Sequence, residues 1–279
     1  MKVLITGGSG TLGRELVTAF AHDEVLAPTR AELDIADRAA VHALVAATRP
    51  DAIVCSAAMT DVDGCEDHAD AAFRYNALSV RAFAEAAARV GAHLTYVSTD
   101  YVFDGEQAEP YTEWDTVHPI SVYGASKLAG EVEAGPDAAI VRTSWVCGLG
   151  PKNFVAAVLR LADQHPTLRF IADQSSRPTV ASDLAPAIRR LVVDRRRGTF
   201  HVTNDGVATR FDMVQAILTA SGRDPGQVLP IPAAELTPPQ KAARPTQSVL
   251  DNAVLRIEGA PLLPDWRDSL PAVVAALLD

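Results

Sequence analysis

The chain has 279 residues, 48% of them hydrophobic and 22% charged, a balance typical of one large globular domain or two closely packed ones. A formal net charge of −10 argues against the basic surface of proteins that bind nucleic acid or anionic membranes, so we expect neither partner. No stretch approaches the roughly 20 apolar residues of a membrane span, and the start lacks a signal-peptide pattern. Three cysteines without metal-ligand spacing fit a reducing compartment, so we expect a cytoplasmic protein.

Short apolar runs alternate with helical patterns through the first half of the chain. Residues 2–6 read as a buried strand, followed by a glycine-rich turn and a helical pattern that carries Leu12, Leu16 and Phe20. Further short strands are expected at 25–27, 52–55, 93–98 and 138–144, and Ala-rich helices at 38–47 and 71–89. Such alternation predicts an α/β fold with a doubly wound parallel sheet of the Rossmann type.

The second half continues the alternation less regularly. We expect helices at 152–163 and 182–193, strands at 167–172 and 199–203, and a helix from about Arg210 that Thr209 and Asp212 cap. Residues 223–248, rich in Pro, Gln and Ala, read as a surface connection. The prediction is a dinucleotide-binding domain over 1–150 and a smaller α/β region over 151–279 that mainly binds substrate, with an approximate boundary and interleaved elements.

A glycine-rich turn joins the first strand to the first helix. Gly7, Gly10 and Gly13 recur every third residue, which suits a tight turn, close approach of backbone to a pyrophosphate, and close helix–strand packing. The N-terminus of the following helix offers free N–H groups to the anion. We therefore predict dinucleotide binding by this turn, including Ser9, Thr11 and Leu12, and by Ala57 and Ala58 after the third strand.

The residues after the second strand bear on the choice of cofactor. A carboxylate at this place holds the ribose 2′-hydroxyl of NAD, whereas a basic residue accommodates the 2′-phosphate of NADP. Here the strand runs into Arg30, which can fork onto a phosphate, so NADPH is favoured. Glu32 lies close enough to keep NADH as an alternative. Asp34 and Ile35 are predicted to border the adenine, although an N-cap role explains an Asp here equally well.

Tyr123 and Lys127 are four residues apart, a spacing that puts both on one face of a helix. A nearby ammonium is expected to lower the pKa of the phenol and make it a useful proton donor. Lys127 can also reach the nicotinamide ribose. The pair therefore predicts reduction or oxidation at a carbonyl carbon.

The fourth strand ends in two hydroxyl residues, Ser98 and Thr99, at a carboxyl edge where ligands of such sheets gather. Consecutive strand residues point to opposite sides, so both cannot face the substrate equally. We choose Thr99, whose hydroxyl would donate to the carbonyl oxygen as negative charge develops.

At this point the sequence resembles the extended short-chain dehydrogenases, and within them the dTDP-4-dehydrorhamnose reductases, nearly from end to end. The most specific matches are Ser-Thr-Asp-Tyr-Val-Phe at 98–103 and Arg-Thr-Ser-Trp-Val at 142–146. The resemblance implies reduction of the C4 ketone of a dTDP-6-deoxy-4-ketohexose by NAD(P)H, with Thr99, Tyr123 and Lys127 as the triad. It also implies a sugar pocket and a nucleotide site formed by Thr60, Val62, Tyr101, Trp145, Asn153, Gln174 and Arg244.

The sequence also departs from that family. Cys55 and Met59 replace the usual Asn and His or Tyr, which makes the pocket edge less polar and leaves another keto-sugar open. Of the acidic residues that share a cation in some members, Glu15 matches, but Ser182 and Arg267 stand at the others, so we expect no metal. A regulatory subunit that binds nucleotide without catalysis is the alternative reading. Either a monomer or a homodimer is compatible with the sequence.

Overall fold

A six-stranded parallel sheet forms the centre of the molecule. The computed structural model describes residues 1–150 and 153–278, and its main sheet has the strand order β2-β1-β3-β4-β5-β10. The strands are β1 (Lys2–Thr6), β2 (Glu24–Leu26), β3 (Ala52–Cys55), β4 (His93–Thr99), β5 (Ala139–Thr143) and β10 (Gly198–His201). All five pairings are parallel. The strand order reverses between β1 and β3, which opens a crevice for ligands at the carboxyl ends of these strands.

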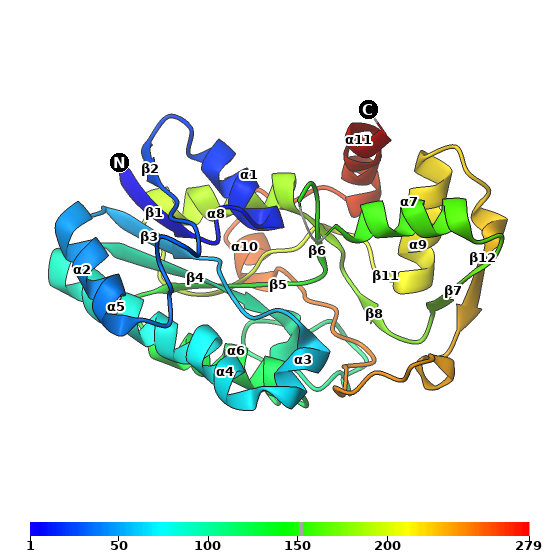
Figure 1. The fold of residues 1–279 in the computed structure, drawn as a ribbon, viewed down its shortest axis with the longest axis horizontal. Coiled ribbons are helices and arrows are strands. Elements are labelled where there is room, and N and C mark those ends of the chain that lie inside the picture. The colour runs from blue at the N-terminus through cyan, green and yellow to red at the C-terminus, as the bar shows by residue number, and fades with distance from the viewer. Residues whose placement is uncertain (151–152, 279) are drawn as a thin grey trace.

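Helices cover both faces of this sheet (Figure 1). On one face α1 (Thr11–Ala19) packs against α8 (Ala181–Val193), and on the other lie α2 (Arg38–Thr48), α5 (Ser79–Val90) and α6 (Val122–Ala134). Because strand side chains alternate, β1 supplies both cores: Val3 and Ile5 join the first and Leu4 the second. The predicted Rossmann-type α/β fold is confirmed.

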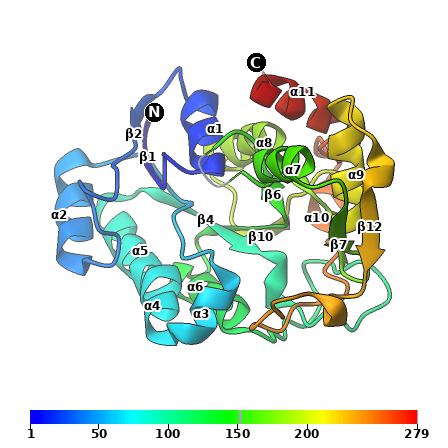
Figure 2. The same cartoon turned by 45° about the vertical axis from the view of Figure 1, so that its right-hand side comes forward.

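The C-terminal region has a core of its own. Helices α7 (Phe154–Gln164), α9 (Arg210–Ala220) and α11 (Trp266–Leu278) contact one another around a buried cluster that includes Met213, Ile217 and Trp266. Figures 1 and 2 both show these helices together at one side of the main sheet. Three short strand pairs complete the region: β6 (Val146–Cys147) with β9 (Thr179–Val180), β7 (Leu168–Ile171) with β12 (Val228–Ile231), and β8 (Ser175–Ser176) with β11 (Ala208–Thr209).

The two regions are interleaved along the chain. α8 and β10 follow residue 150 in sequence, yet they belong to the main sheet and its cover. The division into 1–150 and 151–279 therefore stays a prediction about function. The remaining short elements are α3 (Val62–Asp67), α4 (Ala69–Phe73), η2 (Asp100–Val102), η3 (Pro225–Gln227), η4 (Ala233–Glu235) and α10 (Ala253–Ile257). In the described parts of the chain, no helix is both long and apolar enough to cross a membrane.

Three expectations need correction or limits. The single helix expected over 71–89 is divided into α4, a π-helical turn η1 (Arg74–Leu78) and α5. The connection expected over 223–248 contains β12, which pairs with β7 in a small parallel sheet. The expected start of the next helix at residue 152 lies outside the described residues, and α7 is described from Phe154, capped by Asn153.

Candidate active site

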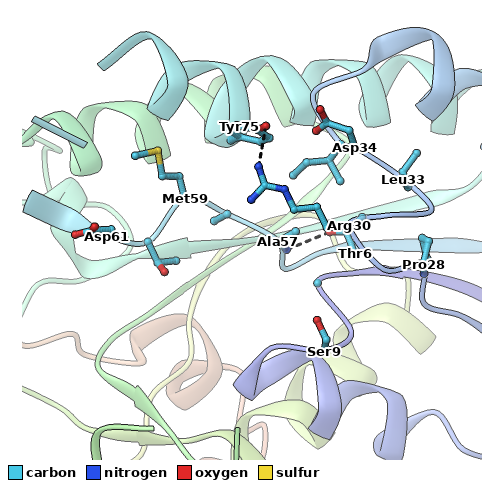
Figure 3. A pocket seen from close by; sticks show the side chains of 14 residues that line it. Thr6, Ser9, Pro28, Arg30, Leu33, Asp34, Ala57, Met59, Asp61 and Tyr75 are labelled. Atoms are coloured by element: carbon cyan, nitrogen blue, oxygen red, sulfur yellow. Dashed lines mark hydrogen bonds between the residues drawn. The ribbon is translucent and has the colours of Figure 1, made fainter. Parts of the chain in front are cut away.

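A cavity of about 440 Å³ lies at the carboxyl ends of β1 and β3, at the reversal of the strand order. Among the residues predicted for the cofactor, the structure brings seven to its walls, together with Thr60 from the predicted substrate set. Those seven are Gly7, Ser9, Arg30, Asp34, Ile35, Ala57 and Ala58. Figure 3 shows this cavity, with Ser9 below it and Met59, Asp61 and Tyr75 along the opposite side. A carboxyl-edge cavity of this kind is the usual dinucleotide position in doubly wound sheets.

The glycine turn fits a bound pyrophosphate. Gly7 has a φ of +74°, which L side chains rarely adopt. A Cβ at Gly13 would lie 2.0 Å from the Gly7 carbonyl oxygen, so only glycine allows this approach of α1 to the turn. Gly10, Thr11, Leu12 and Gly13 belong to the turn and the first turn of α1. The bare backbone and the N-terminus of α1 thus form a cradle that suits a dinucleotide phosphate.

Arg30 extends from the loop after β2 toward Tyr75 (Figure 3). One guanidinium nitrogen donates to the Tyr75 hydroxyl at 3.1 Å, and the guanidinium carbon lies 5.3 Å from the centre of the ring. The Glu32 carboxylate is engaged within its own loop, because it accepts hydrogen bonds from both the backbone N–H and the hydroxyl of Thr29. This part of the cavity therefore presents a cation in a position suited to a phosphate.

Tyr123 and Lys127 lie on α6. This helix begins one residue after its N-cap Ser121, whose hydroxyl accepts a hydrogen bond from the Gly124 N–H. The buried Lys127 ammonium donates to the Val97 carbonyl at 2.6 Å and lies 4.1 Å from the centre of the Tyr96 ring. Burial lowers the pKa of Lys127 to about 7, against the opposing effect of the Glu131 carboxylate. The ammonium is thus anchored on β4.

Burial also controls the phenol. It raises the pKa of Tyr123 above the ordinary tyrosine value, and a hydrogen bond with the Thr99 hydroxyl opposes that rise. The expectation that Lys127 lowers the pKa of this phenol is therefore wrong for this geometry, since desolvation of the phenol outweighs the other effects. A protonated Tyr123 is the form that can donate a proton.

Ser98 and Thr99 do point to different neighbours. The Ser98 hydroxyl donates to Glu131, while the Thr99 hydroxyl donates to the buried Asp100 carboxylate at 3.0 Å and accepts from the Tyr101 N–H. Asp100 was not among the predicted site residues. Burial raises its pKa to about 6, although hydrogen bonds from Ser248, Thr99 and Ser176 oppose the rise. Thr99 is the hydroxyl beside Tyr123.

Asn76 is another residue that the sequence did not reveal. From η1, its side chain bonds to both the N–H and the carbonyl of Met59, and it donates to the Ser126 hydroxyl at 2.9 Å. Ser126 in turn donates to the Tyr123 carbonyl. Asn76 thereby joins the cavity wall at Met59 to the helix that carries Tyr123.

Several predicted substrate residues gather beside Tyr123. The Tyr101 ring meets the Tyr123 ring edge-on, with centroids 5.8 Å apart. Arg244 lies close enough to Tyr101 to lower the pKa of that phenol against the larger effect of burial, and it forms an ion pair with Asp63 at 2.9 Å, which connects it to α3, the helix that begins with Val62. Residues distant in sequence are thus brought together around the phenol.

Other predicted substrate residues lie toward the C-terminal helices. Trp145 has a φ of +42°, and its ring is covered by the guanidinium of Arg210 at 3.8 Å. Arg210 was predicted only as the start of a helix; the capping box of Thr209 and Asp212 was correct and places it there. Asn153 caps α7. Gln174 donates to Gln240 and has no recorded contact with the Tyr123 group among the described residues.

The residues that depart from the family pattern have distinct positions. Cys55 is buried at the end of β3, and burial raises the pKa of its thiol to about 12, so it packs as a small apolar side chain. Met59 lines the cavity. Over residues 1–150 and 153–278 no group of three His, Cys, Asp or Glu side chains could hold a metal ion; the expectation of no metal stays a prediction.

Comparison with known proteins agrees with this arrangement. The family model described as "RmlD substrate binding domain" matches residues 1–278. A dTDP-4-dehydrorhamnose reductase of Mycobacterium tuberculosis is 39% identical over 99% of this chain and 93% of its own length. A dTDP-4-keto-6-deoxy-D-glucose reductase of Streptomyces niveus is 37% identical, over 96% of this chain and 94% of its own.

A solved structure gives the same result. The crystal structure of a dTDP-4-dehydrorhamnose reductase of Bacillus anthracis in complex with NADP has a TM-score of 0.94 and 35% identity, with 99% of each chain covered. Because the family model covers almost the whole chain, and the Mycobacterium tuberculosis relative matches it over nearly the full length of both, this chain belongs to the RmlD substrate-binding-domain family.

Proposed function

We propose that this protein is an NADPH-dependent oxidoreductase that reduces the C4 ketone of a dTDP-4-keto-6-deoxyhexose. The observation that carries the proposal is the meeting of Tyr123 and Thr99 at the end of β4, in the sheet whose carboxyl edge also bears the cavity at β1 and β3, with the Tyr101 ring edge-on to the phenol. The names of the relatives and the NADP complex of the Bacillus anthracis protein agree with it.

NADPH, when bound, supplies the hydride that adds to the carbonyl carbon. The glycine turn, Ala57, Ala58, Asp34 and Ile35 would hold the dinucleotide, and Arg30 would meet the 2′-phosphate. The residues lining the cavity support this assignment, because they combine an open backbone cradle with a cation that has no carboxylate partner among the described residues. NADH remains the alternative cofactor.

Tyr123 would donate its proton to the ketone oxygen as the C–O double bond becomes a hydroxyl. A buried phenol with a raised pKa keeps that proton until an acceptor with developing negative charge is placed against it. The hydroxyl hydrogen of Thr99 is donated to Asp100 in this structure, so it would have to turn from Asp100 to reach the substrate oxygen, while the hydroxyl oxygen stays beside the phenol. Lys127, with a pKa of about 7, can exchange a proton near neutrality and would also bind the nicotinamide ribose.

The sugar would lie between Tyr123 and the C-terminal region. Tyr101, Thr60, Val62 and Trp145 are proposed as its walls, since apolar faces suit the C–H surface of a deoxyhexose while the phenol and indole retain donors. Asn153, Gln174 and Arg244 are proposed for the nucleotide. The edge-on contact of the Tyr101 ring with the Tyr123 ring supports the first part of this assignment, and the effect of Arg244 on Tyr101 brings Arg244 to the same place.

The identity of the keto-sugar is a narrower question. One relative is named for dTDP-4-dehydrorhamnose and another for dTDP-4-keto-6-deoxy-D-glucose, which differ in configuration at carbons that a 3,5-epimerase inverts. Met59 at the cavity wall replaces a polar residue of the family pattern, so it favours testing both.

The decisive assay follows NADPH oxidation with dTDP-4-keto-6-deoxyglucose, with and without its 3,5-epimerase. We expect turnover by the wild type and a loss of about 100-fold or more in Tyr123→Phe, the range that general-acid groups contribute, with unchanged NADPH binding. Turnover only with the epimerase would assign dehydrorhamnose. If the wild type binds NADPH but is as inactive as the variant on both sugars, the proposal fails and the regulatory alternative is favoured. A cytoplasmic location and a monomeric or homodimeric state stay predictions.

A further inference from the structure

Arg210, the first residue of α9, is a half-buried cation without a counterion among the residues that the structure describes. Its only recorded hydrogen-bond partner there is the Met213 sulfur at 4.0 Å. Burial lowers the pKa of its guanidinium, although the Tyr101 phenol and the Asp100 carboxylate act in the opposite direction. Arg210 thus lies at the same cluster as Tyr101 and was assigned no role above.

A buried charge normally has a partner, because removing an ion from water is costly unless another group compensates. The neighbouring Arg244 follows this rule, since Asp63 pairs with it at 2.9 Å. Arg210 does not. The two guanidiniums are close enough to influence each other unfavourably, and one carboxylate serves only one of them. Arg210 therefore keeps a positive charge that no described carboxylate pairs with directly.

Two aromatic rings flank the guanidinium. Its carbon lies 3.8 Å from the centre of the Trp145 ring and 4.9 Å from that of Phe154. A guanidinium stacked in this way still carries N–H groups in its plane. Planar, charged donors in a pocket of low polarity match the oxygens of a phosphate.

A second free donor lies beside the same rings. Asn153 precedes Phe154, and its side-chain oxygen caps α7 by accepting from the Val155 and Ala156 N–H groups. Its amide nitrogen, in contrast, is buried and has no partner within the described parts of the chain. Buried polar atoms are nearly always hydrogen-bonded, so an orphan donor on the residue before Phe154, whose ring the Arg210 guanidinium approaches, points to an absent acceptor.

We infer that Arg210 is the anion-binding side chain of the substrate cleft, where it holds the diphosphate of the sugar nucleotide together with the Asn153 amide. This inference rests on the proposed function for the kind of substrate, because the diphosphate is the permanent negative charge of a dTDP-sugar. The same stack fixes Trp145, whose φ of +42° is a strained value for a bulky residue. Arg210 thereby joins the grip on the diphosphate to the wall of the sugar site.

The test compares binding of dTDP and of thymidine by calorimetry, with NADP⁺ present to fill the other phosphate site. Arg210→Met keeps an apolar side chain of similar length against Trp145, and Arg210→Lys keeps the charge without the planar fork. Arg169→Met is the matched control: Arg169 lies in β7 of the same region, where it is exposed and pairs with Glu235. Reductase turnover is not needed for this measurement.

We expect Arg210→Met to weaken dTDP binding by about 10- to 100-fold, the range of a lost charge-assisted hydrogen bond, and thymidine binding by less than about twofold. Arg210→Lys should recover part of the affinity for dTDP, and Arg169→Met should behave as the wild type. If dTDP and thymidine lose affinity equally, Arg210 acts only as support for Trp145 and the inference is overturned. No change with either ligand overturns it too.

The nucleotide assignment can fail separately. If the wild type binds UDP but not dTDP, and Arg210→Met weakens UDP relative to uridine, the anion site stands while the proposed dTDP-sugar substrate is wrong. If the wild type binds dTDP and Arg210→Met leaves that affinity intact, the proposed function stands while the anion site is wrong.

Discussion

Replacement of Asp100 by Asn should make the protein more stable at neutral pH. The Asp100 carboxyl is 2% exposed and accepts hydrogen bonds from the hydroxyls of Thr99, Ser176 and Ser248. These bonds compensate only part of its desolvation, because its pKa is raised from 3.8 to about 6. The folded state therefore binds this proton more tightly than the unfolded chain does.

The size and sign follow from the two pKa values. A rise of about two units corresponds to about 3 kcal/mol at 1.36 kcal/mol per unit. Between pH 4 and pH 6 the folded state holds more protons than the unfolded state, so stability falls as pH rises through this window. Below pH 4 the protonated carboxyl carries no such cost, and above pH 6 the cost is complete.

Asp100→Asn removes the titration while preserving the shape of the side chain. We expect the variant to lose this decline between pH 4 and pH 6 and to exceed the wild type by up to about 3 kcal/mol at pH 8. Urea unfolding followed by circular dichroism at several pH values measures the difference. Asp104→Asn is the control with the opposite sign, because the Tyr111 hydroxyl lowers the pKa of Asp104 and its carboxylate stabilises the fold above pH 4.

Two results would refute this reasoning. The first is a difference in unfolding free energy between wild type and Asp100→Asn that stays constant from pH 4 to pH 8. The second is a variant less stable than the wild type at pH 8, which would mean that the three hydroxyls stabilise the carboxylate more than burial destabilises it.

Three further substitutions test the cofactor site. Arg30→Ala should weaken NADPH binding by about 10- to 100-fold and NADH binding little. A double-mutant cycle with Tyr75→Phe should be non-additive for NADPH binding alone, because the Tyr75 hydroxyl accepts a hydrogen bond from the guanidinium. Equal losses of affinity for both cofactors would place Arg30 at the shared pyrophosphate instead. Gly13→Ala should abolish detectable NADPH binding in a fluorescence titration, because the new Cβ would lie 2.0 Å from the Gly7 carbonyl oxygen, and undiminished binding would contradict the cradle.

Much of the fold could be predicted because its strands are buried on both faces and read as short apolar runs. β1 and β3 begin and end at the predicted residues. β12 was missed because Val228–Ile231 contains a proline and pairs with only one neighbour, so it resembles a turn more than a strand. The π-helical turn at Arg74–Leu78, from which Asn76 contacts Met59, leaves no trace in an Ala-rich helical pattern.

The residues of the candidate site also divide into those that the sequence could locate and those that it could not. Residues at strand ends or with regular spacing, such as Gly7 and Thr99, could be located because topology carries them to one sheet edge. Asp100, Asn76 and Arg210 could not, because each is defined by contacts that span 50 or more residues or by the absence of a partner. For Arg210 the sequence offered one signal, the capping box that starts α9, but a helix start says nothing about what the side chain faces.

The four-residue spacing of Tyr123 and Lys127 matters for a reason other than the one the sequence suggests. Both residues contact β4: Tyr123 lies against Thr99, and the Lys127 ammonium donates to the Val97 carbonyl. Four residues of helix rise about 6 Å, and two residues of strand span roughly 6.6 Å, so the distance between the two residues along α6 matches the distance between their contacts along β4. The helix thus runs opposite to β4, with the phenol at the strand's carboxyl end and the ammonium one step deeper. The ammonium is fixed to the sheet, so its effect on the reaction depends on where the ligand lies relative to Tyr123 and Lys127. The four-residue spacing thus places the proton donor at the edge of the sheet and keeps the cation buried beneath it.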